Sequence, residues 1–196
     1  MKKLWPGAIA AVMLIAACKK DKNNTPNKDA SKYITSKMVE VNPTGFAPLT
    51  ATITLGTTEP TRVHIKVTGK HGPDSDVTKE FEEVSTTHSI PVLGLYGGYD
   101  NQVEVTLFDA SGVNLGSTNM SVPTDTLHAD LPDIKIDVAP TSVQQKMTLV
   151  SYYGYAGDSQ FPFNPFIFDD YGDIRWYIDH TNSDMIKQLS IQDGLE

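Results

Sequence analysis

The chain has 196 residues, of which 39% are hydrophobic and 20% are charged, so its composition is globular rather than disordered. The formal net charge of -8 argues against a nucleic-acid partner, because such a partner calls for a basic patch. The single cysteine excludes an intramolecular disulfide, and the length allows one full domain and part of a second.

Residues 1–17 have the pattern of a secretory leader. Met1-Lys2-Lys3 is basic, and the apolar run that follows (4–17) is shorter than the roughly 20 residues of a membrane span. The run ends in LIAAC, which resembles the lipobox of bacterial lipoproteins. The resemblance implies cleavage before Cys18 and its acylation, and hence a lipid-anchored protein of the bacterial cell envelope, periplasmic or outer-membrane-facing. An ordinary signal peptide with an incidental cysteine is the alternative.

Residues 18–32 are predicted to be a polar tether. After the cysteine, the stretch KKDKNNTPNKDASK (19–32) holds no large apolar side chain, which indicates a flexible segment. The protein is therefore expected to be attached to membrane lipid through Cys18 rather than to span the bilayer.

Residues 33–135 are predicted to form an immunoglobulin-like β-sandwich. Alternating apolar and polar residues predict strands at 49–57, 61–69 and 101–109. Weaker candidates are 33–41, 78–84, 87–95 and 113–122. Several short strands with turn residues between them favour a sandwich, although the Cys…Trp…Cys core of antibody domains is absent.

The composition changes after Pro132, and a boundary is predicted between residues 132 and 140. Further strands are predicted at 134–140 and 146–153, and a hairpin that turns at Gly172 is predicted in FDDYGDIRWYID (168–179). The hairpin is apolar enough to need covering on at least one face. Strict alternation would place Ile174, Trp176 and Ile178 on one face and Arg175, Tyr177 and Asp179 on the other.

The sequence contains no recognisable motif for catalysis or for binding a cofactor or metal. It lacks a glycine-rich phosphate loop, HExxH, a Cys/His cluster and GxSxG. The five histidines share no metal-ligand spacing and are predicted to lie on the surface: His64, His71, His88, His128 and His180. The sequence therefore predicts no cofactor and no metal site.

Two clusters near the hairpin have both a functional and a structural interpretation. Asp169, Asp170 and Asp173 could bind calcium, but acidic residues are common at turns for local hydrogen bonding. The aromatic residues could stack on a sugar or a phenol, but core packing is favoured for the strand residues Phe166, Phe168 and Trp176.

Three stretches together resemble bacterial aryl-sulfate sulfotransferases. VNPTGFAPLTATITLGTTEPTRVHIKVTGK (41–70) and IPVLGLYGGYDNQVEVTL (90–107) are similar to the N-terminal immunoglobulin-like domain of that family. FPFNPFIFDDYGDIRWYID (161–179) is similar to the entry of its catalytic β-propeller. The resemblance implies an all-β chain: an immunoglobulin-like β-sandwich (33–135), then the first, incomplete blade of a six-bladed β-propeller (140–196).

The resemblance also implies a function. The family transfers a sulfuryl group from an aryl sulfate to a phenol through a sulfohistidine, without a nucleotide sulfate donor. This chain would be the N-terminal portion of such a membrane-anchored enzyme, with a homodimer through the N-terminal domain left open.

No catalytic residue carries over from the family. None of the five histidines matches the family's motifs, so the 196 residues are expected to be inactive, and Arg175 is expected to support its strand. The alternative is a free-standing β-sandwich lipoprotein that binds a protein or a glycan.

Overall fold

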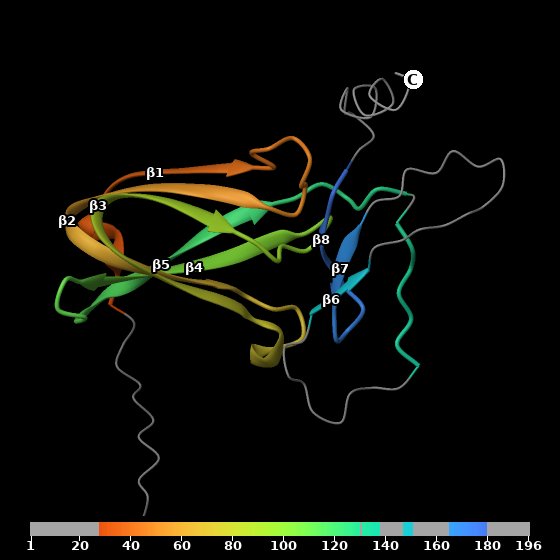
Figure 1. Ribbon diagram of the computed structural model, residues 1–196. Coiled ribbons are helices and arrows are strands. Elements are labelled where there is room, and N and C mark those ends of the chain that lie inside the picture. Colours follow the sequence, from red (N-terminus) through yellow and green to blue (C-terminus); the bar gives the residue numbers. More distant parts are fainter. Residues whose placement is uncertain (1–27, 130, 138–146, 151–164, 180–196) are drawn as a thin grey trace, which may run out of the picture.

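A computed structural model describes residues 28–129, 131–137, 147–150 and 165–179. In these ranges the protein is all-β apart from two short 3₁₀ helices, η1 (Ala30–Tyr33) and η2 (Pro73–Ser75). A five-stranded antiparallel sheet and a three-stranded one lie side by side (Figure 1). The strands of the first are β1 (Ile34–Val41), β2 (Ala51–Val67), β3 (Val77–Val92), β4 (Asp100–Asp109) and β5 (Asn114–Pro123). Those of the second are β6 (Met147–Val150), β7 (Phe166–Asp169) and β8 (Ile174–Tyr177).

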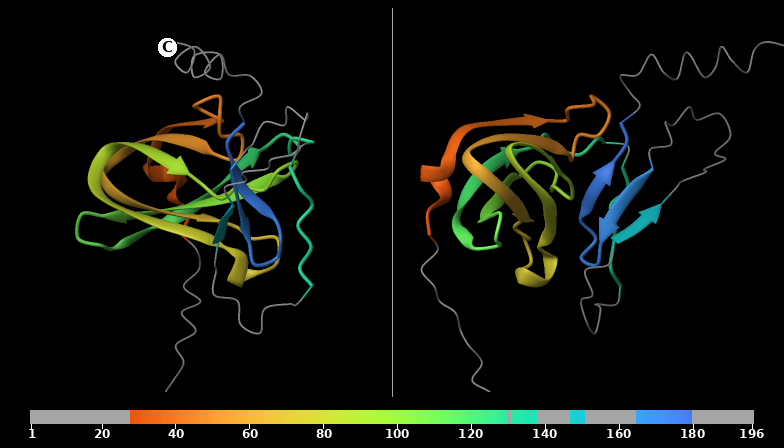
Figure 2. Two further views of the ribbon diagram at one scale, coloured as in Figure 1. Left: turned by 45° about the vertical axis from the view of Figure 1, so that its right-hand side comes forward. Right: turned by 60° about the vertical axis from the view of Figure 1, so that its left-hand side comes forward.

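Strands β2 and β3 are long enough to belong to both walls of the sandwich. The first half of β2 pairs with β1 and the end of β3, whereas its second half pairs with the start of β3 and with β4. The β2–β3 register shifts between Gly56 and Val63, and such irregularities bend a sheet. The five strands therefore form one curled sheet around the core (Figure 2).

This continuity corrects the predicted strand boundaries. The sequence predicted separate strands at 49–57 and 61–69, and at 78–84 and 87–95, but each pair is one bent strand. Pro60 lies inside the register shift of β2, where a residue without an N–H removes no ladder hydrogen bond. The turn-like residues therefore bend the chain without ending the strand.

The apolar core lies between the two walls and continues to the second sheet. The predicted alternation is confirmed in β2 and β4, whose inward residues are almost fully buried: Val63, Ile65, Val67, Val103, Val105 and Leu107. Phe166, Ile174 and Tyr177 belong to the same cluster of buried residues. The sandwich thus covers one face of the hairpin.

The segment before the second sheet differs from its prediction. Residues 134–137 of the predicted strand 134–140 are not in a strand, and the remainder lies outside the described residues. The carbonyl of Ile134 faces Gly172 so closely that an added Cβ there would lie 3.0 Å from its oxygen. This segment crosses the β7–β8 turn instead of joining a sheet.

The N-terminal segment 28–33 is packed against β5. The Ser117 N–H donates to the Lys28 carbonyl at 2.7 Å, Asp29 forms a parallel bridge with Ser117, and Ala30 is fully buried. The folded structure therefore includes residues 28–32, which the sequence predicted to belong to the tether. Ala30 can enter the core because its side chain is small, although the residues next to it are polar.

Gly116 makes this contact possible, and its replacement by alanine is expected to destabilise the protein. Its φ is +133°, and an added Cβ would lie 2.2 Å from the Lys28 oxygen. Gly45 is a matched control, because its φ is +77° and nothing lies within 4 Å of an added Cβ. Gly45→Ala should cost about 1–2 kcal/mol through strain alone. Gly116→Ala should cost more in urea unfolding and expose residues 28–33 to protease; equal losses would contradict the close approach.

Candidate functional site at the sheet junction

A β-bulge in β8 determines which side chains face the sandwich. Ile167 pairs with Trp176 and Phe168 with Ile174, so Arg175 is the extra residue on its strand. The predicted alternation of faces was therefore wrong: Ile174 and Tyr177 both join the core. Phe166 is buried in the core as expected and Phe168 packs against it, whereas Trp176 pairs with Ile167 outside that cluster.

Arg175 joins the second sheet to the loop that follows β3. Its side chain is 1% exposed, and Nη1 donates to Asp169 Oδ2 at 2.7 Å and to the Tyr96 hydroxyl at 2.8 Å. Nε and Nη2 both donate to the Gly94 carbonyl, at 3.0 and 2.7 Å. The guanidinium carbon also lies 3.7 Å from the centroid of the Tyr96 ring. Arg175 therefore has a structural role, as expected.

Asp169 organises the β7–β8 turn as well as pairing with Arg175. Its Oδ1 accepts hydrogen bonds from the backbone N–H groups of Tyr171 and Asp173, at 3.0 and 3.1 Å. Gly172 has the positive φ predicted for the turn, +88°. Local hydrogen bonding thus accounts for this acidic residue. Across the described ranges, no three His, Cys, Asp or Glu side chains gather as metal ligands would.

A second, more exposed contact holds the same turn to the sandwich. Asp173 Oδ2 lies 2.7 Å from His71 Nε2, and its Oδ1 lies 3.5 Å from Lys70 Nζ. The His71 ring stacks on Tyr171 with centroids 4.2 Å apart. Lys70 Nζ also lies over the Tyr96 ring, 4.4 Å from its centroid. The hairpin is therefore held on the sandwich by the buried hydrogen bonds of Arg175 and by the partly exposed contacts of Asp173 with Lys70 and His71.

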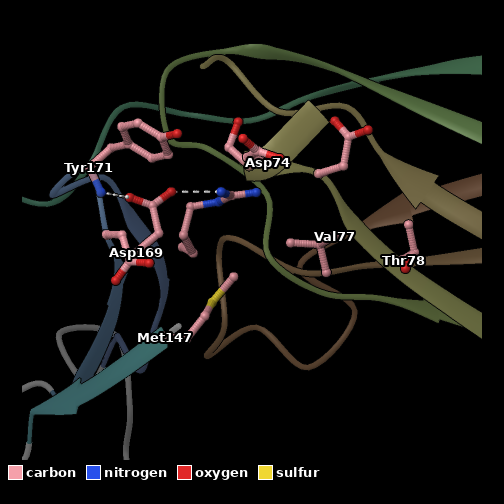
Figure 3. A pocket seen from close by; sticks show the side chains of 10 residues that line it. Asp74, Val77, Thr78, Met147, Asp169 and Tyr171 are labelled. Atoms are coloured by element: carbon pink, nitrogen blue, oxygen red, sulfur yellow. Dashed lines mark hydrogen bonds and ion pairs between the residues drawn. The ribbon is translucent and has the colours of Figure 1, made fainter. Parts of the chain in front are cut away.

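A pocket of about 290 Å³ opens beside this junction. Met147 borders it from β6, and Val77 and Thr78 border it from β3 (Figure 3). Its charged lining consists of four aspartates and the already paired Arg175: Asp74, Asp76, Asp169 and Asp170. This excess of negative charge disfavours the binding of an anion in this pocket.

The prediction of surface histidines was wrong for His88. This residue is 8% exposed, and its Nε2 lies 3.0 Å from the hydroxyl of Thr61, where β2 and β3 bend together. The sequence does contain the signal for this burial, because His88 is in phase with the buried Ile90 and Val92 of β3, and Thr61 is in phase with Val63 of β2. Cys18 and His180 lie outside the described residues.

Burial lowers the pKa of His88 below its ordinary value of 6.5. The unfolded chain therefore binds a proton more readily than the folded one, so the free energy of unfolding should fall as the pH drops below about 6.5, by at most ~1.4 kcal/mol per pH unit. His88→Gln should flatten this dependence between pH 7 and 5 in urea titrations. Parallel pH profiles for the two proteins would contradict the assignment.

The sequence match agrees with this architecture. Residues 38–126 match the family model described as the arylsulfotransferase Ig-like domain. These residues form an arylsulfotransferase Ig-like domain. The match runs from β1 past β5 and includes Gly94 and Tyr96, the sandwich partners of Arg175. The predicted family is thus confirmed for the Ig-like domain, and the propeller stays a prediction. Among curated proteins, no sequence matches the chain.

Proposed function

We propose that the chain is the N-terminal portion of a membrane-anchored aryl-sulfate sulfotransferase, in which the Ig-like domain carries and orients the start of the catalytic domain. The buried Arg175 joint is the observation that carries this proposal. It fastens the second sheet to Gly94 and Tyr96, two residues inside the Ig-like domain. A buried, multiply bonded guanidinium fixes the relative orientation of the elements it connects.

The second sheet is proposed to be the first blade of a propeller. The strand registers align Leu149 with Ile167 and Ile167 with Trp176, in a row that crosses the sheet. This row lies on the face opposite to Phe166 and Tyr177, and Leu149 is 63% exposed. Propeller blades pack face to face, so a neighbouring blade would cover such an apolar row.

The proposed chemistry requires a histidine that substrate can reach. Attack of an imidazole nitrogen on sulfur would break the S–O bond to the departing phenolate, and a phenol oxygen would then take the sulfuryl group from the histidine. His88 is buried against Thr61, and His71 is held by Asp173 and Tyr171. Neither His88 nor His71 is therefore proposed as the attacking histidine, and the inactivity of the 196 residues stays a prediction that rests on the absence of the family's histidine motifs from the sequence.

The anchor is proposed to be a lipid on Cys18, which would place the protein in the bacterial cell envelope. The apolar run that ends in LIAAC supports this proposal. Within the described part of the chain, no helix has the length and hydrophobicity needed to cross a bilayer.

Antibodies against residues 33–135 would test the proposed function. They should isolate from the source cells a polypeptide clearly heavier than 21.5 kDa that transfers sulfuryl groups from 4-nitrophenyl sulfate to phenol. The purified 196-residue chain should release no nitrophenol above the buffer rate. A native polypeptide of 21.5 kDa or less, without transferase activity, would contradict the proposal and favour the free-standing lipoprotein.

A further inference from the structure

We propose that the Ig-like domain is a spacer that holds the second sheet away from the membrane. The inference rests on the proposed acylation of Cys18. It adds the orientation of the Ig-like domain and the second sheet relative to the lipid surface. It depends on where the N-terminal segment joins the sandwich and where the second sheet joins it.

The N-terminal segment joins the sandwich near the start of β5. Lys28 and Asp29 are bound to Ser117, which lies opposite Thr106 of β4. The absence of a side chain at Gly116 lets the Lys28 carbonyl approach this closely. The point at which the anchor segment enters the fold is therefore fixed by backbone contacts.

The second sheet joins the sandwich at the opposite end of β4 and β5. Arg175 binds the Tyr96 hydroxyl, and the backbone of Tyr96 is hydrogen-bonded to Asn101 at the start of β4. Asn101 pairs with Val122 near the end of β5. Figure 1 and the right-hand view of Figure 2 show η1 and the second sheet at opposite ends of the sandwich.

The orientation follows from where the tether is attached, and two distances set its scale. The five residues from Ser117 to Val122 span about 17 Å at about 3.4 Å per residue. The chain from Cys18 to Lys28 can reach no farther than about 35 Å even when fully extended. A body that is tethered at one end keeps that end nearer the surface on average. We therefore expect the β4–β5 turn to be the part of the sandwich nearest the lipid, with the second sheet on the aqueous side.

Quenching by lipid can test this geometry on the full chain. Val113→Cys and Asp125→Cys introduce a single free thiol just outside either end of β5, at exposed positions, because the thiol of Cys18 would be acylated. Each variant is labelled with bimane and bound to vesicles of phosphatidylethanolamine and phosphatidylglycerol that contain lipids with nitroxide headgroups. Each probe is compared with the same variant carrying Cys18→Ser, which gives the quenching of unanchored protein.

The probe at residue 113 should be quenched at least about twofold more than the probe at residue 125, because the ten residues of β5 separate them by about 34 Å. Equal quenching, or stronger quenching at residue 125, in protein that floats with the vesicles would overturn the spacer while leaving the anchor intact. If the protein floats with the vesicles and the Cys18→Ser variant does not, the lipid anchor on Cys18 is confirmed. If the parent chain does not float with the vesicles, both the proposed anchor and the proposed spacer are contradicted.

Discussion

Arg175→Met should cost about 3–5 kcal/mol of unfolding free energy, because it leaves the buried carboxylate of Asp169 without its cation. The Gly94 carbonyl loses the donors of Arg175 in the same step, and the Tyr96 hydroxyl keeps only the Lys70 N–H as a donor. Urea unfolding of the full chain measures this loss. We also expect protease to cleave the β7–β8 hairpin more quickly, since the hairpin would lose its main attachment to the Ig-like domain.

Two further variants separate the buried ion pair from a general effect of losing an arginine. Arg62→Met removes a partly exposed arginine that lies 3.5 Å from Glu82, and it should cost no more than about 1 kcal/mol. Adding Asp169→Asn to Arg175→Met should recover part of the stability, because the uncompensated charge is removed while an acceptor for the turn remains. A loss below about 1 kcal/mol for Arg175→Met would show that the joint does not hold the two sheets together.

Asn101→Ala should destabilise the Ig-like domain by roughly 3 kcal/mol, because the Tyr96 N–H loses its acceptor, at about 1–3 kcal/mol for a buried group, and three carbonyls lose one donor each. The side chain of Asn101 is fully buried, and its Oδ1 accepts from the Tyr96 N–H at 2.8 Å. Its Nδ2 donates to the carbonyls of Tyr96, Tyr99 and Val122. Thermal or urea unfolding measures the effect.

The matched control is Asn119→Ala, at an exposed position on the neighbouring strand β5. This change should lie within about 0.5 kcal/mol of the parent, as is usual for surface substitutions. Similar stabilities for the two variants would mean that the loop before β4 is held by other contacts. Because that loop carries Tyr96, Asn101→Ala should also weaken the packing of the second sheet.

Local patterns were sufficient to predict the all-β fold, the inward faces of β2 and β4, and the turn at Gly172. Alternation with period two depends only on the residues of the strand itself, and a turn depends only on the few residues around its glycine. Both features can therefore be predicted from short stretches of sequence. The two quoted stretches at 41–70 and 90–107 were sufficient for the family of the Ig-like domain, since 38–126 match its model.

The junction could not be predicted from local patterns, because it depends on partners far apart in the sequence. Arg175 binds Gly94, which lies 81 residues earlier in the sequence. The bulge at Arg175 is defined by the pairing of β8 with β7, so β8 alone does not reveal it. One inserted residue reverses the faces of a strand, so alternation in β8 predicted the wrong side for Tyr177. The burial of His88, in contrast, follows the alternation of β3, where His88 is in phase with Ile90 and Val92. The burial of Ala30 could not be predicted in this way, because it depends on the docking of residues 28–33 on β5, a strand far away in the sequence.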